Sequence, residues 1–318
     1  MLNRLKEYLA KPRLINCLKP SFLADFSIKM LNSQTLKAAV IGDPISHSLS
    51  PKIHNFLLDK YDINGTYIAI QVSKEELAGC VKHLIDSGFA GFNVTLPHKE
   101  EVFKICDFVS KTARLTGAVN TVIISADKKI FGHNSDAEGF LNNLRNSHPD
   151  FDLNQKNAFV IGAGGAARAL VYSIIKSGAK KVFITNRNQN RAAELIKNFA
   201  DFTQTKNCQI EFLSASDFEQ NLDQCDLLVN STSLGMTGQQ PLEIDIRNLQ
   251  KSAVVYDIVY KPLMTDLLRK ANSQGNKITT GIGMLIQQAL VGFEAWFRHK
   301  AQADEELMKN AIEWSQTK

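Results

Sequence analysis

Hydrophobic residues follow two different spacings along this chain. From Lys37 onward, short runs rich in β-branched and aromatic residues alternate with longer stretches whose apolar residues recur every three to four positions. The first spacing is typical of strands and the second of amphipathic helices. Strands are predicted at residues 37–41, 66–72, 89–94, 118–125 and 130–132, and in the second half at 158–161, 181–185, 209–213, 226–229, 254–258 and 277–279. Helices are predicted between them, beginning with residues 51–61 and 73–87.

This alternation of strands and helices predicts an α/β fold, with mostly parallel sheets covered by helices on both faces. The chain has 318 residues, about twice the length of a typical domain, so we expect two domains. The polar segment 142–157, which contains Pro149, is the best candidate for the linker between them.

Composition narrows the class of protein. Hydrophobic residues make up 44% of the chain and charged residues 22%, as in an ordinary globular protein. The net charge of +5 is too small and too dispersed to predict nucleic-acid binding, but it suits small anionic ligands. No apolar run is long enough to span a membrane. The five cysteines form no CxxC pair and no metal-like cluster with histidine, which predicts free thiols, a cytoplasmic location and no metal site.

Residues 1–34 differ from the rest of the chain, because basic residues are mixed with scattered Leu and Phe and acids are few. Three interpretations stay open: a transit peptide, an additional helix packed on the first domain, or a true start at Met30. The segment has no long apolar core, which argues against a secretory signal. We expect it to take no part in catalysis.

A glycine-rich segment follows the predicted strand at 158–161 and opens a helix. Gly162, Gly164 and Ala167 have the spacing of a dinucleotide-binding loop. In such loops the first glycine makes a tight turn, the second lets the backbone approach a pyrophosphate, and the small third residue packs helix against strand. A turn without a ligand is the alternative, but the order of strand, motif and helix favours a cofactor. The pyrophosphate would bind amides at the positive end of the helix.

The choice of cofactor depends on the end of the next strand. An NAD enzyme usually places Asp or Glu there to bind the ribose 2′-hydroxyl. In this chain the segment after that strand is Asn186-Arg187-Asn188-Gln189-Asn190-Arg191, with no acid before Glu194. Arg187 and Arg191 would suit a 2′-phosphate, because guanidinium groups bind its oxygens in pairs. The alternative is that both arginines are solvated at a helix start. The sequence therefore favours NADP.

The first half of the chain carries serines next to a helix start. Ser48 precedes Ser50-Pro51, a pattern in which proline occupies the first helical turn and Ser50 caps the helix. Two hydroxyls beside a helix N-terminus are also a good cradle for a carboxylate. Capping and ligand binding are equally plausible for Ser50 and are compatible.

Lys99 and Asp136 are the candidates for acid–base chemistry. Lys99 begins a predicted helix, where its positive charge meets the positive end of the helix dipole. Such a position should lower the pKa of a lysine. The alternative is that Lys99 is an ordinary surface lysine without a catalytic role. Asp136 falls in the first turn of another helix, behind a capping-box pattern of Ser135 and Glu138. It could pair with Lys99 or only stabilise its own helix. Asn120 is a further polar side chain, at a strand start.

These motifs together resemble the shikimate dehydrogenase family. The resemblance rests on Ser-x-Ser-Pro, Asn-Val-Thr-x-Pro-x-Lys, Gly-Ala-Val-Asn-Thr, Gly-x-Asn-Ser-Asp and Gly-x-Gly-Gly-Ala-x-Arg, in that order. It extends through residues 230–236, 256–260 and 283–288 and covers roughly 37–318. It implies reversible, NADPH-dependent reduction of 3-dehydroshikimate to shikimate, in the biosynthesis of chorismate and the aromatic amino acids. Asn188 departs from the Thr or Ser that is common in the family.

The resemblance also implies roles for individual residues and a division of the chain. Lys99 and Asp136 would be the catalytic pair. Contacts to the substrate are implied for Ser48, Ser50, Thr95, Asn120, Tyr260 and Gln288. Contacts to NADP are implied for Gly162, Ala163, Gly164, Gly165, Ala166, Asn186, Arg187, Arg191, Thr232, Ile258 and Gly281. The expected domains are a substrate domain of residues 35–140 and 283–318 and a Rossmann-type domain of residues 141–282, with the last helices returning to the first domain.

Two other functions remain open at this stage. One is a quinate/shikimate dehydrogenase with mixed NAD and NADP use, and the other is a non-catalytic NADP-binding regulator on the same fold. The presence of Lys99 and Asp136 argues against the regulator. The expected partner is a small-molecule substrate, not nucleic acid or a membrane, and the expected assembly is a monomer or a homodimer.

Overall fold

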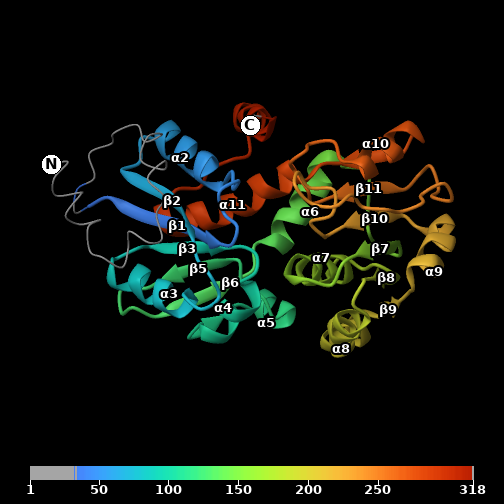
Figure 1. Cartoon of the computed structure of the whole chain (residues 1–318), viewed down its shortest axis with the longest axis horizontal. Coiled ribbons are helices and arrows are strands. Elements are labelled where there is room, and N and C mark those ends of the chain that lie inside the picture. Colours follow the sequence, from blue (N-terminus) through green and yellow to red (C-terminus); the bar gives the residue numbers. More distant parts are fainter. Residues whose placement is uncertain (1–31, 33, 317–318) are drawn as a thin grey trace.

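The computed structural model describes residue 32 and residues 34–316. The chain forms two lobes, each built on one six-stranded sheet, which lie side by side in Figure 1. This arrangement confirms the predicted two-domain α/β fold. The expectations for residues 1–31 lie outside the described residues. None of the described helices combines the length and the apolar character that crossing a bilayer requires.

The sheet of the first lobe is mixed. Its strands lie in the order β2 (Gly65–Gln71), β1 (Leu36–Gly42), β3 (Gly91–Val94), β5 (Thr121–Ile124), β6 (Ile130–His133) and β4 (Phe108–Val109). β1 pairs in parallel with β2 and β3, whereas β5 runs antiparallel to both β3 and β6. The start of β5 therefore lies at the same edge as the carboxyl ends of β1, β3 and β6. Residues from four separate segments meet at this edge.

Helices cover both faces of this sheet. One face packs against α2 (Ser50–Lys60), α11 (Gly281–Phe297) and α12 (Glu305–Gln316). The other face packs against α3 (Leu77–Asp86), α4 (Lys99–Ile105) and α5 (Lys111–Thr116). On the first face the ring of His54 stacks on Tyr67, with ring centroids 3.9 Å apart. Trp296 Nε1 donates to the carbonyl of Val122 at 2.9 Å, which fastens α11 to β5.

The sheet of the second lobe is entirely parallel. Its strands lie in the order β12 (Lys277–Thr279), β11 (Val254–Asp257), β10 (Leu227–Asn230), β7 (Asn157–Ile161), β8 (Lys181–Thr185) and β9 (Gln209–Phe212). One face packs against α6 (Asp136–Ser147), α7 (Gly165–Lys176) and α8 (Gln189–Lys206). The other packs against α9 (Ala215–Gln220), the 3₁₀ turn Leu222–Gln224 and α10 (Asp266–Ser273). The predicted strands match these within a few residues, and β4 is an addition.

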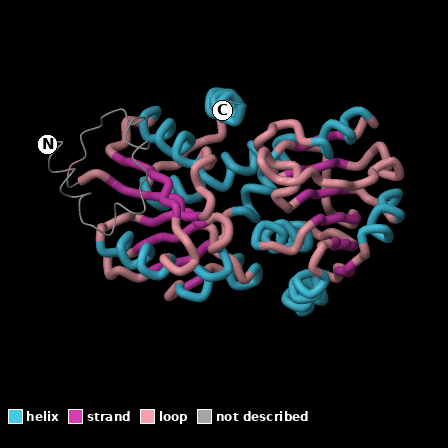
Figure 2. The backbone as a smooth tube through the Cα atoms, in the orientation of Figure 1, coloured by secondary structure: helices cyan, strands magenta, loops and turns pink. Residues whose placement is uncertain are grey.

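The predicted linker at 142–157 is wrong in its first part, because α6 continues through Ser147. Tertiary contacts explain the difference. Asn143 is buried, and its Nδ2 donates to the Tyr256 hydroxyl at 2.7 Å and to the Thr280 carbonyl at 3.1 Å. A polar sequence thus forms helix because buried partners satisfy it. Helices α6 and α11 run between the lobes and pack closely on each other (Figure 2).

Two predicted helix caps are also wrong. Ser50 is the first residue of α2 and does not cap it; Ser48 Oγ instead accepts the Ser50 amide at 3.3 Å. Ser135 precedes α6, but its side chain makes no capping bond, so the capping box with Glu138 does not form. The Ser135 hydroxyl bonds elsewhere, to Asn120 and Thr121. The local pattern failed at Ser135 because partners distant in sequence compete for its hydroxyl.

Candidate active site

The two sheets bring their carboxyl-terminal edges toward each other. In open α/β sheets, ligands bind at this edge because loops and helix N-termini converge there. The glycine-rich loop of the second lobe approaches the start of α4 in the first: a Cβ atom added to Gly165 would lie 3.4 Å from Lys99 Cδ. Tyr260, which follows β11, packs on the hydrophobic core of the first lobe. Segments of both lobes therefore line one site.

Lys99 and Asp136 form an ion pair within this site. Lys99 Nζ lies 2.5 Å from Asp136 Oδ2, and the side chains are only 14% and 7% exposed. Each residue is the first of its helix, α4 and α6, so two helix N-termini point into the same place. The sequence left open whether Asp136 pairs with Lys99, and the structure shows that it does. A pair with so little solvent is held firmly, because losing one partner would leave the other charge buried alone.

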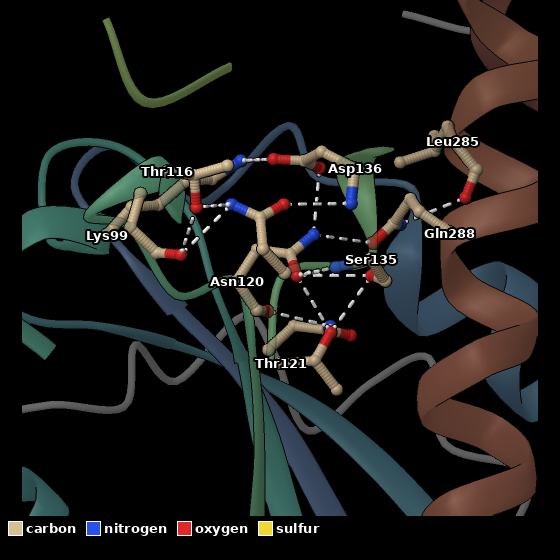
Figure 3. A network of polar contacts seen from close by, with 11 residues as sticks. Lys99, Thr116, Asn120, Thr121, Ser135, Asp136, Leu285 and Gln288 are labelled. Carbon is tan, nitrogen blue, oxygen red and sulfur yellow. Dashed lines mark hydrogen bonds and ion pairs between the residues drawn. The ribbon is translucent and has the colours of Figure 1, made fainter. Parts of the chain in front are cut away.

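Asn120 and Gln288 join this pair from two other elements. Asn120 Nδ2 donates to Asp136 Oδ1 at 2.8 Å and lies 3.4 Å from Gln288 Oε1 (Figure 3). Gln288 comes from α11 and is anchored by its Nε2 to the Leu285 carbonyl at 2.9 Å. Both asparagine and glutamine are buried. Lys99, Asp136, Asn120 and Gln288 thus form one connected polar cluster with opposite charges at its centre.

The other predicted substrate residues lie at the same edge but make no hydrogen bond with this cluster among the described residues. Ser48 and Ser50 follow β1, with Ser50 buried and Ser48 partly exposed. Thr95 follows β3 and is partly exposed, and its methyl group lies against Gly42. Burial raises the pKa of Tyr260, against the opposing effect of a main-chain hydrogen bond with Leu49.

The glycine-rich loop has the shape that a pyrophosphate requires. Gly162 has φ +113°, a conformation that favours glycine, and a Cβ atom there would meet Ser231 Oγ at 2.6 Å. Gly164 precedes α7, and a Cβ atom on it would meet nothing within 4 Å. No side chain caps α7, so its first amides remain available to an anion. The loop, which includes Ala163, Gly165 and Ala166, therefore fits a dinucleotide.

The turn after β8 carries the arginines predicted to select NADP. Arg187 is exposed, and Asn186 Nδ2 donates to the Asn188 carbonyl at 2.7 Å. Asn188 Oδ1 accepts the Arg191 amide at 3.2 Å, so the departure from Thr or Ser leaves α8 with a side-chain cap. The Arg191 guanidinium lies 3.4 Å from Glu100 on α4, an ion pair between the lobes.

The loops after β10 and β11 are fastened to each other by a buried carboxylate. Asp257 accepts from Asn230 Nδ2 at 3.0 Å, from the Val259 amide at 3.0 Å and from Thr265 Oγ1 at 2.7 Å. Burial raises the pKa of Asp257 to about 6, although these donors oppose the shift.

Three predicted cofactor residues lie at or beside these loops. Asn230 Oδ1 accepts the amide and hydroxyl of Thr232. Gly281 packs so tightly that a Cβ atom on it would lie 2.1 Å from the carbonyl oxygen of Ile258. Thr232, Ile258 and Gly281 are therefore held in place by buried contacts.

Three residues of these networks, Asn93, Thr121 and Asp257, carry no role in the motifs of the sequence. Asn93 and Thr121 stand inside motifs that carried other assignments, and Asp257 is the last residue of β11, where binding residues often lie. Two hydrophilic residues at the ends of neighbouring strands indicate a polar contact, but only when the pairing of the strands is known. Asn93 and Thr121 face each other because β3 and β5 are antiparallel in this register.

Family models match both halves of the chain. Residues 40–122 match the shikimate dehydrogenase substrate binding domain, and residues 144–259 match shikimate / quinate 5-dehydrogenase. The shikimate dehydrogenase (NADP(+)) of Paramagnetospirillum magneticum is 43% identical over 270 residues, which cover 85% of this chain and 95% of that one. The same name belongs to a protein of Jannaschia sp. that is 42% identical over 278 residues, 86% of this chain and 96% of that one.

Solved structures agree with these relatives. A shikimate dehydrogenase in complex with NADP⁺ superposes with a TM-score of 0.81 at 34% identity, over 91% of this chain and 99% of that one. The shikimate 5-dehydrogenase of Thermus thermophilus, in complex with NADP(H) and shikimate, gives a TM-score of 0.77 at 33% identity, over 88% of this chain and all of the other.

Proposed function

The chain belongs to the shikimate dehydrogenase family, and from that premise we propose that it reduces the 3-keto group of 3-dehydroshikimate to shikimate, reversibly, with NADPH. Such an enzyme serves the biosynthesis of chorismate and the aromatic amino acids. The observation that carries the proposal is the Lys99–Asp136 ion pair beside the glycine-rich loop. A proton donor and a site for a dinucleotide are what a ketone reduction requires.

Residues of the second lobe would hold NADP. The free amides at the start of α7, with the turn of residues 162–166, would bind the pyrophosphate. Arg187 and Arg191 would bind the 2′-phosphate beside Asn186. Thr232, Ile258 and Gly281 would border the nicotinamide end. When bound, the cofactor supplies the hydride.

Lys99 would manage the proton. Its ammonium group donates a proton to the oxygen of the ketone as that oxygen gains negative charge, and its neutral amine takes the proton back in the oxidation direction. The positive charge also stabilises the developing alkoxide before the transfer. Asp136 holds the Lys99 ammonium group in place through the 2.5 Å contact. A lysine held in this way loses little freedom when the substrate binds.

The substrate would lie between the polar cluster and the serines. Ser48 and Ser50 would bind its carboxylate next to the start of α2. Thr95, Asn120, Tyr260 and Gln288 would bind the carboxylate or ring hydroxyls. We also propose a cytoplasmic location, because the cysteines of the described residues are free thiols, as is usual in a reducing compartment. A monomer or a homodimer stays a prediction.

The test is a two-by-two comparison of oxidation rates. Purified protein is assayed with shikimate and with quinate, each with NADP and with NAD. We expect shikimate with NADP to give the highest kcat/KM. Comparable rates with quinate or NAD would instead assign the chain to the quinate/shikimate branch, which the NADP-specific names of its relatives do not favour.

The Arg187→Ala variant tests the choice of cofactor separately. A charge-assisted hydrogen bond is worth about 1.5–3 kcal/mol, so we expect kcat/KM for NADP to fall by about ten- to a hundredfold. The rate with NAD should change little, because NAD lacks the 2′-phosphate. Equal losses with both cofactors would contradict the role of Arg187. Arg247, an exposed arginine paired with Asp245 far along the chain, is the control for substitution to alanine.

A further inference from the structure

Thr121 is a buried residue that the proposed reaction does not yet use. It begins β5 and is only 1% exposed. Its strand neighbours are Asn93 on β3 and His133 on β6. Residues that face each other across antiparallel strands bring their side chains together on one face of the sheet. Figure 3 shows the Thr121 side chain directly beside Asn120 and Ser135, within the network that reaches Asp136.

The orientation of the Asn120 amide is determined by a main-chain donor. The Ser135 amide lies 2.7 Å from Asn120 Oδ1. A backbone N–H can only donate, so the oxygen of the Asn120 amide must face Ser135. Its nitrogen then faces Asp136 Oδ1, at 2.8 Å. The direction of this contact matters, because a carboxylate can accept from the amide but cannot donate to it.

The orientation of Asn93 is determined in the same way by an acceptor. Asn93 Nδ2 lies 3.0 Å from the main-chain carbonyl oxygen of Asn120, which can only accept. Asn93 Oδ1 therefore faces the Tyr67 hydroxyl, which donates to it at 2.6 Å. Burial raises the pKa of Tyr67 well above its usual range, so the phenol keeps its proton. With this orientation, Asn93 Nδ2 also donates to Thr121 Oγ1 at 3.3 Å.

The single proton of the Thr121 hydroxyl then has two possible acceptors. One is Asn120 Oδ1 at 2.9 Å, and the other is Ser135 Oγ at 3.0 Å. In the second case the Ser135 hydroxyl donates in turn to Asn120 Oδ1, at 3.1 Å. Either way Asn120 Oδ1 accepts a hydrogen bond from a hydroxyl as well as the one from the Ser135 amide. Hydrogen bonds that run in one direction polarise one another, so donation onto Oδ1 strengthens donation from Nδ2 to Asp136.

We propose that Thr121 is a positioning residue for the reaction. Its hydroxyl supplies the hydrogen bond that Asn120 Oδ1 accepts besides the one from the Ser135 amide, and thereby keeps the Asp136 carboxylate directed at Lys99. This inference rests on the proposed function. Thr121 touches neither Lys99 nor Asp136 through a hydrogen bond and acts through Asn120. The chain of donors runs from Tyr67 on β2 through Asn93, Thr121 and Asn120, and it ends at the charged pair.

The test compares two substitutions at Thr121 with a matched control. Thr121→Val keeps the shape and removes the hydroxyl, whereas Thr121→Ser keeps the hydroxyl. We expect kcat of Thr121→Val to fall about tenfold, which is the effect of losing one buried hydrogen bond, while KM for shikimate changes less than about threefold. Thr121→Ser should restore kcat. The control is Thr203→Val on α8, where a buried hydroxyl donates only to the Ala200 carbonyl of its own helix.

A purely structural role predicts a different pattern. Thr121→Val and Thr203→Val would then lower the Tm alike and leave kcat at the wild-type value, and this result would overturn the proposal. Tyr67→Phe is a second variant in case Thr121→Val does not fold, because it removes only the far end of the donor chain; we expect kcat to fall by about twofold to threefold. An unchanged kcat in that variant would also count against the proposal.

The failure of the proposed function would look different. In that case the wild-type protein itself would not oxidise shikimate with NADP. A crystal structure of Thr121→Val then tests the positioning role without activity. We expect the Asn120–Asp136 contact to lengthen beyond hydrogen-bonding distance or to split into two conformers. An unchanged contact would overturn the inference.

Discussion

The described parts of the two lobes contain almost the same polar arrangement, and only the one in the first lobe includes a lysine that we propose takes part in the reaction. In the first lobe Asn120 accepts from Ser135 and Thr121 and donates to Asp136. In the second lobe Asn230 accepts twice from Thr232 and donates to Asp257. Both asparagines lie at the edge of their sheet where ligands would bind. An asparagine with its acceptor satisfied locally is thus a general device for holding a carboxylate.

The two arrangements differ at Oδ2, the carboxylate oxygen that does not accept from the asparagine. Asp136 Oδ2 meets a lysine ammonium group, whereas Asp257 Oδ2 meets the hydroxyl of Thr265. The lysine can exchange a proton with a substrate, and the threonine cannot do so at ordinary pH. Asp136 is also 5% exposed as a residue, whereas Asp257 is 0% exposed. The paired lysine is therefore what distinguishes the proposed catalytic carboxylate, Asp136, from the structural one, Asp257.

The strongest test of this comparison is to make the same substitution, Asp to Asn, in both lobes. Asp136→Asn removes the charge that holds Lys99, so we expect kcat to fall by about 10²–10⁴-fold, the range for loss of acid–base catalysis. Asp257→Asn keeps a side chain that can accept from Val259, and we expect kcat within about threefold of wild type. Steady-state kinetics with shikimate and NADP provide the measurement, and circular dichroism checks the fold. Similar losses in both variants would refute the distinction between the lobes.

A second way to sharpen the comparison uses pH, because His54 in the first lobe and Asp257 in the second are buried titratable groups whose pKa values are shifted in opposite directions. Burial lowers the pKa of His54 in the first lobe to about 3. Below its unfolded pKa of about 6.5 the unfolded chain binds a proton that the folded chain does not, so His54 makes stability fall as pH falls. Asp257 has a folded pKa of about 6, above its unfolded value. At a pH between the unfolded and the folded pKa of Asp257, the folded chain binds a proton that the unfolded chain does not. Asp257 therefore makes stability rise as pH falls.

Urea unfolding between pH 4.5 and 7 measures both contributions. We expect the stability of Asp257→Asn to fall more steeply on acidification than that of wild type, because the opposing group is gone. We expect His54→Asn to fall less steeply. Each difference should reach about 2 kcal/mol over one and a half pH units, at about 1.4 kcal/mol per unit. Two variants whose slopes shift in the same direction would contradict the assigned pKa values.

The strands and helices of both lobes were predictable from the sequence, but the partners of the Asp136 and Asp257 carboxylates were not. Strands such as β7 and β10 are recognisable because parallel strands buried on both faces read as continuous apolar runs. Lys99 and Asp136 were recognisable as candidates from their place at helix starts. Only the family resemblance implied that they form a pair, because 37 residues separate them and no local pattern shows which helix starts converge. Thr121 was missed for the same reason, since its role depends on the register between β3 and β5.

The errors at Ser50, Ser135 and Asn143 all concern polar residues. Each prediction used a local rule for a polar residue. Ser135 and Asn143 bond to partners distant in sequence, and α2 begins one residue earlier than the rule placed it, so that Ser50 lies inside the helix. Polar residues are the least predictable from local sequence because their bonds are directional and few. Apolar residues only need to be buried, and periodicity is enough to predict that.

The smallest predicted effect concerns the ion pair that joins the lobes. Arg191, a candidate ligand of the 2′-phosphate, lies 3.4 Å from Glu100, and their side chains are 56% and 36% exposed. An exposed pair of this kind is worth about 0.2–1 kcal/mol. Glu100→Gln releases Arg191 from this competitor, so we expect KM for NADP to fall by less than about fivefold. The gain should disappear at 0.5 M salt, because the charges are screened there. NAD is the internal control, since it has no phosphate for Arg191 to bind. A KM that rises on substitution, or that falls equally for NAD, would mean that Glu100 supports the arginine for binding and does not compete with the cofactor for it.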